Sequence, residues 1–503
     1  MKSVRFFLSL ASFLSFVAFA VALSFCLSVF LSSCALEPAE SSSAYVRQKE
    51  NDGETENGKG ESGGEKSSSD EKNGEVSVDS GAEKSEVEDD DEIGADWTIA
   101  VYMAADNSLE PDAINDINEM ERVFVPAGMN VLVLFDRAEG YDASNDNWTD
   151  TRLFLIKYDA DDSNRIVSKR LSSVELGLSE NEETELDMSG KSTLSAFLSF
   201  ARKNYTADKY ALVVWGHGTG WRNSGSFDAR AFAVDGGGGS SSYMTISSMR
   251  QAIESGMGDD KLSFLGFDTC FGCCLESAFE FRNLAEYMAG SPSIEPQSGW
   301  DYCGFFGGLD SDASVVTGEN MCESALNQFR NQYDKCEACA FCTLDLSQCG
   351  LAVEAFNGFS AEAAARITSY EKRDAYLSML KEKCVSYSAG IPGDCFADSL
   401  DFVRNACLYD DSLFECGKKV GDAYSLFVKD SWSAVSESGT CSPGVFVAVK
   451  KSEGVFSNHP SEYVSGNTSA EVSQFVSFAS SYVPTKRKTG SFLDKLFYTT
   501  FDN

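Results

Sequence analysis

The chain has 503 residues, enough for two or three domains with a large buried core, and its 43% hydrophobic content is ordinary for a globular protein. Its formal net charge of −37 is not ordinary. Such acidity excludes nucleic acid as an expected partner, because binding to phosphates requires clustered lysine and arginine.

The N-terminus, residues 1–34, has the pattern of an export signal. Lys2 and Arg5 precede an apolar stretch over residues 6–31, and two serines then lead to Cys34. The stretch is also long enough to cross a bilayer as an uncleaved anchor, which is the alternative. Small residues directly before a cysteine resemble the lipobox of bacterial lipoproteins. This resemblance implies cleavage before Cys34, acylation of that cysteine, and a lipid-anchored position in the bacterial cell envelope.

Residues 35–94 form an acidic segment rich in serine, glutamate, glycine, lysine and aspartate. With almost no aromatic residues, the segment cannot bury enough apolar surface to offset the entropy lost on ordering. Its like charges would extend it, so we predict a disordered spacer. An acidic tail that binds a partner is the alternative.

Apolar runs alternate with helical patterns from residue 95 onwards. Continuous apolar runs predict buried strands, and apolar residues three or four positions apart predict helices. Strands are expected over residues 97–103, 129–136, 151–158, 210–215 and 262–268, and helices over 114–123, 194–204, 245–255 and 275–287. This alternation predicts an α/β fold, in which a mostly parallel sheet is flanked by helices.

The pattern turns helical after about residue 350. Helices are expected over residues 352–368, 374–387 and 412–429, followed by a late strand over 443–449. We therefore expect a sheet domain over residues 95–345 and a largely helical C-terminal region over residues 346–503.

Two reactive residues follow the ends of predicted strands. His217 comes after the strand over residues 210–215, and Cys270 comes after the strand over residues 262–268. One helical crossover separates these strands, and neighbouring parallel strands lie about 5 Å apart. Functional residues of such folds gather beyond the carboxyl ends of the strands, so we expect the two side chains to face each other there.

A cysteine and a histidine in this arrangement indicate nucleophilic catalysis. The thiolate attacks a carbonyl group, and the imidazole takes the thiol proton and returns it to a leaving amine. The other histidine, His459, lies in a loop-like setting far from any cysteine, so His217 is the candidate base. The main-chain N–H groups of Gly218 and Cys270 are candidate donors to an oxyanion. A structural role for His217 is the alternative.

Five stretches, taken in order, carry a resemblance to a known family. They are residues 96–107 (DWTIAVYMAADN), 215–221 (WGHGTGW), 267–270 (FDTC), 295–302 (EPQSGWDY) and, more weakly, 344–347 (LDLS). In order and spacing they resemble the clostripain family of cysteine peptidases, whose fold is related to that of caspases, gingipains and legumains. The resemblance covers residues 96 to about 460. It implies a caspase-like catalytic domain with His217 as catalytic histidine and Cys270 as nucleophile.

The resemblance also implies cleavage after arginine or lysine. The acid of the family's specificity pocket corresponds to Asp268, and a partly buried carboxylate would pair with a guanidinium or ammonium group. Glu295 and Asp301 are candidates to complete the pocket. Expected partners are therefore proteins or peptides with basic residues. A caspase-like preference for aspartate is disfavoured because like charges repel, and an aspartate that only caps the following turn is the other alternative for Asp268.

Further expectations follow from the same resemblance. Members of the family are often activated by self-cleavage in the long polar segment after the histidine, which makes Arg222 and Arg230 candidate cleavage sites. No cofactor is expected, although some members use calcium. Acidic residues at 259–260 and 310–312 could bind it, but they do not form an ordered ligand pattern.

The other cysteines leave alternatives open. In the family an aliphatic residue and methionine are commoner just after the nucleophile, whereas Cys270 is followed here by the residues FGCC at 271–274. Cys273 and Cys274 could pack in the core or act as redox partners. This departure keeps a catalytically degenerate surface binding lipoprotein as the alternative function. Cys336, Cys339 and Cys342 have the spacing of metal ligands, but we interpret Cys342 as a core residue. Irregular spacings predict no particular disulfide.

Overall fold

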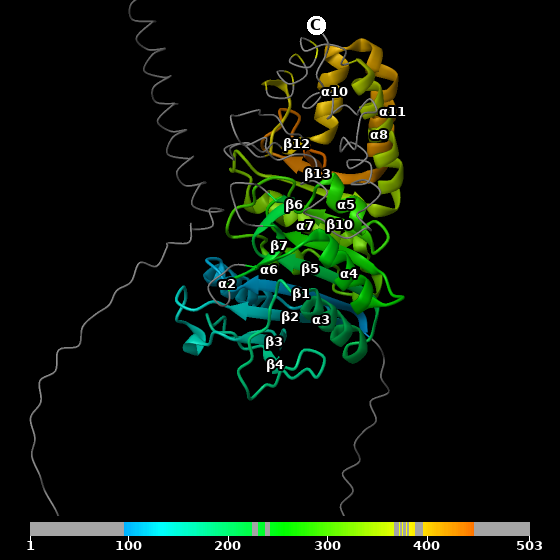
Figure 1. Cartoon of the computed structure of the whole chain (residues 1–503). Helices are drawn as coiled ribbons and strands as arrows, with labels where there is room; N and C mark the ends of the chain where they lie inside the picture. Colours follow the sequence, from blue (N-terminus) through cyan, green and yellow to red (C-terminus); the bar gives the residue numbers. More distant parts are fainter. Residues whose placement is uncertain are drawn as a thin grey trace, which may run out of the picture. The chain divides into compact units, whose positions relative to one another are not determined.

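The computed structural model describes residues 95–446 except 224–229, 237–241, 367–371, 373–374, 376–378, 380–381 and 388–395 (Figure 1). The predicted signal peptide with Cys34 and the predicted spacer lie outside the described residues and stay predictions. Residues 374, 376–378 and 380–381 of the helix predicted over residues 374–387 also lie outside them, as does the predicted strand beyond Phe446, and the described residues 384–387 are not helical. In the described part of the chain, no helix is both long enough and apolar enough to cross a bilayer.

Within the described residues, nine strands form one sheet (Figure 1). Its central strands are parallel and run in the order β10 (Ala285–Gly290), β9 (Leu262–Asp268), β5 (Ala207–Trp215), β1 (Ala95–Ala105) and β2 (Met129–Arg137). Antiparallel strands extend both edges, namely β11 (Ala340–Asp345) and β13 (Val428–Ser433) beside β10, and β3 (Thr151–Leu155) and β4 (Lys169–Leu171) beside β2. The predicted mostly parallel sheet with flanking helices is confirmed.

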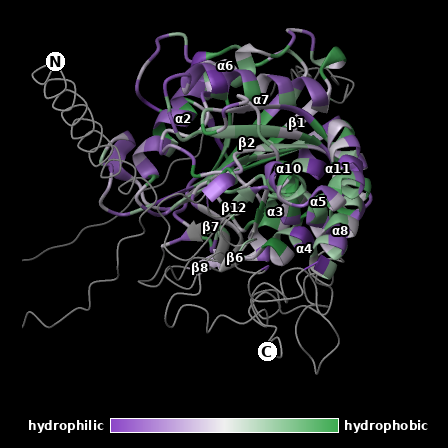
Figure 2. Cartoon of the chain, turned by 90° about the horizontal axis from the view of Figure 1, so that it is seen from above, coloured by the Kyte–Doolittle hydropathy of each residue, from purple (hydrophilic) through white to green (hydrophobic). Residues whose placement is uncertain are grey.

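A hydrophobic core covers each face of the sheet, because successive side chains of a strand point to opposite faces. Tyr102 of β1 packs into the core that contains Phe197, and Met103 packs into the core that contains Phe305. The first core includes residues of α3 (Lys191–Asn204), α4 (Ile246–Met257), α5 (Leu275–Phe281), α8 (Cys349–Arg366) and α11 (Phe414–Phe427), and the second includes residues of α2 (Glu110–Arg122), α6 (Tyr302–Gly307) and α7 (Gly318–Gln332). Figure 2 shows β1 and β2 between these two helical layers. Burial on both faces explains why the parallel strands are continuous apolar runs.

The helix predicted over residues 275–287 is wrong in its second half. Helix α5 ends at Phe281, a turn follows, and β10 joins the sheet beside β9. The buried residues Ala285, Met288 and Ala289 fit either conformation, so their spacing does not distinguish a helix from a strand. Hydrogen bonds to β9, which is distant in sequence, decide the conformation.

The C-terminal region is helical but also contributes to the sheet. Helices α8 and α11 correspond to predicted helices, whereas the sequence pattern does not predict α10 (Ser399–Tyr409). Strand β14 (Gly444–Phe446) lies within the predicted late strand and pairs with β12 (Phe396–Asp398). Strand β13, which is not predicted, pairs with β11 and completes one edge of the large sheet. The division into domains at residue 345 stays a prediction.

Candidate active site

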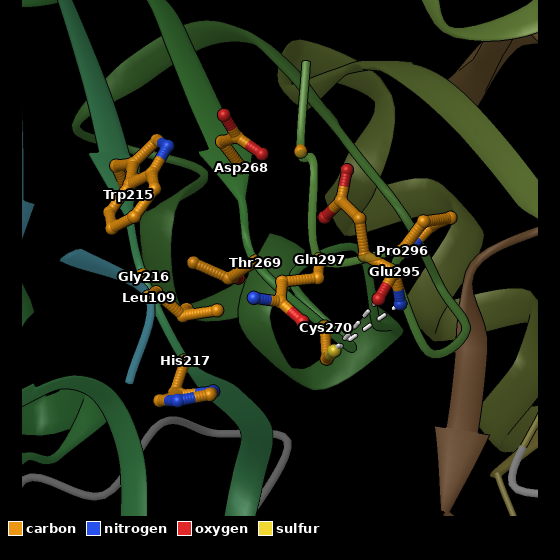
Figure 3. Close-up of a pocket in the computed structure, with 11 residues that line it drawn as sticks. Leu109, Trp215, Gly216, His217, Asp268, Thr269, Cys270, Glu295, Pro296 and Gln297 are labelled. Atoms are coloured by element: carbon orange, nitrogen blue, oxygen red, sulfur yellow. Dashed lines mark hydrogen bonds between the residues drawn. The ribbon is translucent and has the colours of Figure 1, made fainter. Parts of the chain in front are cut away.

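The residues that follow β5 and β9 line one cleft, because these two strands are neighbours. Trp215 at the end of β5 lies opposite Asp268 at the end of β9, and His217 and Cys270 each follow two residues later. The cleft has about 310 Å³ of empty space and is lined by Leu109, Trp215, Gly216, His217, Asp268, Thr269, Cys270, Glu295, Pro296, Gln297 and Gly299 (Figure 3).

Two glycines allow the main chain after β5 to pass close to Cys270. Gly216 has a φ of 134°, which residues with a side chain rarely adopt, and its N–H donates a hydrogen bond to the carbonyl oxygen of Asp268 (3.2 Å). A Cβ on Gly218, the first residue of β6 (Gly218–Asn223), would clash with the carbonyl oxygen of Cys270. The Gly218 main chain therefore adjoins Cys270. Donation of their N–H groups to an oxyanion stays a prediction.

The Cys270 thiol is held by the loop between β10 and α6. Its Sγ accepts a hydrogen bond from the N–H of Glu295 (3.2 Å) and lies 3.7 Å from the Glu295 carbonyl oxygen (Figure 3). Phe271 has a φ of 56°, which is unusual for a bulky residue, and its N–H donates to the carbonyl oxygen of Ser293 (2.9 Å). The same loop thus holds both the strained turn and the Cys270 sulfur in place.

His217 is a buried and uncharged base. Burial lowers the pKa of its imidazole to about 4. Its Nε2 lies 3.4 Å from the Oγ of Ser108, in the segment after β1. An imidazole with this pKa is neutral near pH 7 and can accept a thiol proton. We therefore expect Cys270 to lose its proton as it attacks, rather than to rest as a thiolate beside an imidazolium.

One part of the cleft is acidic. The Oδ2 of Asp268 accepts hydrogen bonds from the Tyr302 hydroxyl (3.0 Å) and the Trp300 N–H (3.3 Å). Burial nevertheless raises the pKa of Asp268 to about 7. Burial, and then the neighbouring charge of Asp268, raises the pKa of Glu295 well above its ordinary value. A cation that enters the cleft would favour the ionised form of these carboxyl groups and pair with them.

Asp116 is a third buried acid near the cleft, and it is not among the residues that the sequence predicts. It lies on α2, and its Oδ2 accepts a hydrogen bond from the indole N–H of Trp215 (2.7 Å). Burial, and then the charge of Asp268, raises its pKa well above the ordinary value. The available sequence signal is weak, because it consists of one acidic residue between the core positions Ile114 and Ile117.

Asp301 does not line the cleft. Its Oδ1 accepts a hydrogen bond from the N–H of Gly304 (2.9 Å), and its side chain caps the N-terminus of α6. Tyr302, which hydrogen-bonds Asp268, is the first residue of that helix. Asp301 therefore supports the acidic part of the cleft without facing it.

Cys273 and Cys274 are fully buried and do not line the cleft. The Sγ of Cys273 lies 3.1 Å from the Sγ of Cys342, and the Sγ of Cys274 lies 2.9 Å from the Oγ of Ser277. These contacts favour the interpretation of both as packing residues.

Cys336 and Cys339 form a disulfide, which the sequence spacing does not predict. Their sulfurs are bonded to each other and are not thiolate ligands. Cys342 is buried in β11 and belongs to the hydrophobic core. These positions favour the interpretation of Cys342 as a core residue over a metal site formed by the three cysteines.

The two candidate self-cleavage sites lie on a small antiparallel sheet. Arg222 belongs to β6 and Arg230 is the first residue of β7 (Arg230–Asp235), which pairs with β8 (Ser242–Met244). Residues 224–229 between them lie outside the described residues. Cleavage after either arginine stays a prediction.

A family model described as the clostripain family matches residues 101–437, which is more than half of the chain. Clostripain from Hathewaya histolytica is 28% identical over 197 residues, which cover 37% of this chain and 36% of clostripain. The match thus spans about a third of that relative.

Solved structures of C11 proteases are similar to this one. The secreted C11 cysteine protease "iotapain" from Bacteroides thetaiotaomicron has a TM-score of 0.50 at 14% identity, over 71% of this chain and 91% of that chain. An inactive zymogen C11 protease from Parabacteroides distasonis has a TM-score of 0.49 at 20% identity, over 71% and 90% of the two chains. The family match covers the sheet from β1 to β13 and the whole cleft, so the chain belongs to the clostripain family of cysteine peptidases.

Proposed function

We propose that the chain is an endopeptidase that cleaves proteins or peptides after arginine or lysine. The observation that carries this proposal is a single cleft in which His217 and Cys270 lie beside the buried acids Asp268 and Glu295. A nucleophile, a base and an anionic recognition site are the parts that hydrolysis after a basic residue requires. Their proximity follows from two neighbouring strands and the loop after β10.

The reaction uses Cys270 and His217 in two steps. As the Sγ of Cys270 attacks the substrate carbonyl carbon, the thiol proton passes to the neutral imidazole of His217. N–H groups of Gly218 and Cys270 bind the oxyanion. The carbon–nitrogen bond then breaks, and the amine leaves with the proton from His217. Water next attacks the thioester with His217 as base, which frees the acid and restores the thiol.

Specificity comes from the acidic part of the cleft. Before substrate binds, burial raises the pKa of Asp268 to about 7, so its carboxyl group is more easily protonated near neutral pH than an exposed aspartate. A guanidinium or ammonium group favours the ionised form and pairs with it away from water. An acidic side chain would face like charge, and a neutral one would leave the carboxylate without a cation to balance its charge.

A panel of fluorogenic peptides tests this proposal with the full chain. The peptides end in arginine, lysine, citrulline or aspartate, and citrulline has nearly the shape of arginine without its charge. We expect cleavage after arginine and lysine, and kcat/KM for citrulline lower by about 100-fold or more, because one partner of a buried charge pair is missing. Equal cleavage after arginine and citrulline would contradict recognition by the acids. If the folded chain cleaves none of the peptides, the result would favour the alternative function, a surface binding lipoprotein without catalytic activity.

The pKa values predict an acidic limit to cleavage near pH 7. Asp268 must lose its proton to pair with the substrate, whereas His217 stays neutral down to about pH 4. Below pH 7, kcat/KM for an arginine peptide should therefore fall about tenfold per pH unit. The measurement is a profile from pH 5 to 9, with the citrulline peptide as control. An equal fall in kcat/KM at low pH for both peptides would assign the acidic limit to a group other than Asp268.

We further propose that the enzyme is exported and lipid-anchored at Cys34 in the bacterial cell envelope. Support comes from the basic and apolar segments before Cys34 and from the acidic, polar residues 35–94 that would separate an anchor from the folded part. Self-activation by cleavage after Arg222 or Arg230 is part of the same proposal. An arginine in either position matches the specificity expected of the cleft.

A further inference from the structure

A groove runs along α8 and α11, which lie side by side in the C-terminal region (Figure 1). It holds about 1480 Å³ of empty space, compared with about 310 Å³ in the cleft. Apart from Ser412, its lining residues run from Leu351 to Glu362 on α8 and from Glu415 to Leu426 on α11, at the spacing of one helical face. At a rise of about 1.5 Å per residue, each face is about 16 Å long.

The groove exposes apolar surface of both helices. Leu351 of α8 is 55% exposed and Leu426 of α11 is 58% exposed, and both line the groove. A Cβ on Gly358, near the middle of the α8 face, would meet no atom within 4 Å. Exposed apolar surface gathered in a hollow is typical of a binding surface. The groove therefore offers space and apolar contacts to a further segment of chain.

The lining of the groove is also acidic. It contains four exposed acids and one exposed lysine, namely Glu354, Glu362, Glu415, Asp422 and Lys419. Glu362 forms an ion pair with Arg366 (2.9 Å), whereas the other three acids form no ion pair with a described residue. An occupant that brings positive charge would balance these carboxylates, and an acidic occupant would be repelled.

One segment of the chain beyond Phe446 has the complementary character. Residues 486–501 (KRKTGSFLDKLFYTTF) contain four basic residues and one acidic residue, in a chain whose net charge is −37. Phe492, Leu496, Phe497 and Phe501 recur at the spacing of one helical face and would extend over about 14 Å as a helix. The acidic residues 35–94 are the opposite case, since their charge has the sign of the groove.

We propose that residues 486–501 bind in the groove between α8 and α11 of the same chain. Their apolar side chains cover Leu351 and Leu426, and their basic side chains lie beside Glu354, Glu415 and Asp422. An amphipathic helix that lays its apolar face in a groove is a common mode of peptide recognition. The proposal goes beyond the proposed peptidase function and does not depend on it.

The described part of the chain ends close to the groove. Strand β14, which ends at Phe446, pairs with β12, and α10 directly follows β12. The hydroxyl of Tyr424 on α11 donates a hydrogen bond to the Oγ of Ser399, the first residue of α10 (3.0 Å). Lys486 lies forty residues after Phe446, and a chain of that length can span up to about 130 Å. Residues 486–501 can therefore reach the groove of their own chain.

Carbodiimide coupling of the full chain tests this contact directly. The reagent joins a lysine amine to a carboxylate that touches it, and mass spectrometry of the digested protein identifies the joined residues. The chain carries Cys270→Ala, so that its own peptidase activity cannot remove the basic segment. We expect the lysines at 486, 488 and 495 to couple to the groove acids at least about tenfold more than to Asp259 or Glu180, which are exposed acids elsewhere.

Two arginine variants test whether the groove itself is the binding surface. Gly358→Arg places a guanidinium in the groove, which the reagent does not couple, and like charge should reduce the coupling about fivefold or more. Gly421→Arg is the matched control, because a Cβ on Gly421 of α11 would also meet no atom within 4 Å and Gly421 does not line the groove. Coupling in this control should be unchanged. Leu426→Arg replaces Gly358→Arg if the latter has no folded circular dichroism spectrum.

A mixture of unlabelled and ¹⁵N-labelled chains separates coupling within one chain from coupling between two. Joined peptides that carry a single label type are expected. Peptides that join the two label types as often as random pairing predicts would overturn the proposal and assign the groove to a second copy. The proposal also fails if the folded chain shows no coupling in the groove, if Asp259 and Glu180 couple equally well, or if the folded groove variant couples like the control. None of these outcomes bears on the peptidase function, which the peptide panel tests separately.

Discussion

Replacing Cys270 by alanine is expected to lower kcat/KM for an arginine peptide by about 1,000-fold or more, because the covalent step then has no nucleophile. Among the described residues, no other cysteine lines the cleft, so no second thiol can take over. The measurement is hydrolysis of the arginine peptide by the full chain and the variant at equal concentration. Circular dichroism should show that the variant is folded.

Cys274→Ala is the matched control for that experiment. Cys274 is as buried as its neighbours, and its thiol contacts Ser277 rather than the cleft, so activity should stay within a few-fold of the original. Retained activity in Cys270→Ala would place the nucleophile elsewhere. An equal loss in both variants would show that the segment after β9 tolerates no change, and the assignment of Cys270 would lose its support.

The Asp268→Asn variant should lose about 100- to 1,000-fold in kcat/KM for arginine and lysine peptides, because a buried carboxylate that pairs with the substrate cation is removed. The change is nearly isosteric, and the amide oxygen of the new side chain would still accept the hydrogen bonds of Tyr302 and Trp300, so the fold should be kept. For the citrulline peptide, kcat/KM should fall much less, so the preference for arginine over citrulline should nearly disappear. Cleavage of all four peptides gives this comparison directly.

Asp301→Asn is the control for charge. Asparagine caps helices as well as aspartate does, and residue 301 does not line the cleft. We therefore expect an unchanged preference for arginine over citrulline in this variant. If Asp301→Asn reduces the preference as much as Asp268→Asn, the specificity arises from the general field of the protein rather than from a pocket carboxylate.

The sequence predicts the positions of His217 and Cys270 because both depend on strands that are apolar over their whole length. Burial on two faces produces a pattern that other conformations rarely share. A strand such as β10 is different, because it is short, partly exposed and defined by its hydrogen bonds to β9. Its residues alone do not distinguish it from the end of α5.

The unpredicted site features depend on contacts between distant segments. Asp116 becomes part of the acidic region only because Trp215 of β5 packs on α2. Asp301 is the opposite case. Its place directly after Trp300 in the sequence suggests the pocket, whereas its side chain caps the N-terminus of α6 and does not line the cleft.

The recognition carboxylate and the attacking sulfur belong to one short piece of chain, since only Thr269 separates Asp268 from Cys270. Two residues span at most about 7 Å, and the ends of β5 and β9 fix both of them. In the proposed reaction, a substrate side chain must therefore carry its charge from the scissile carbonyl back to Asp268 over a distance that the protein cannot adjust. The cleft consequently measures side-chain length as well as charge, and shorter basic amino acids would place either the cation or the carbonyl carbon out of reach.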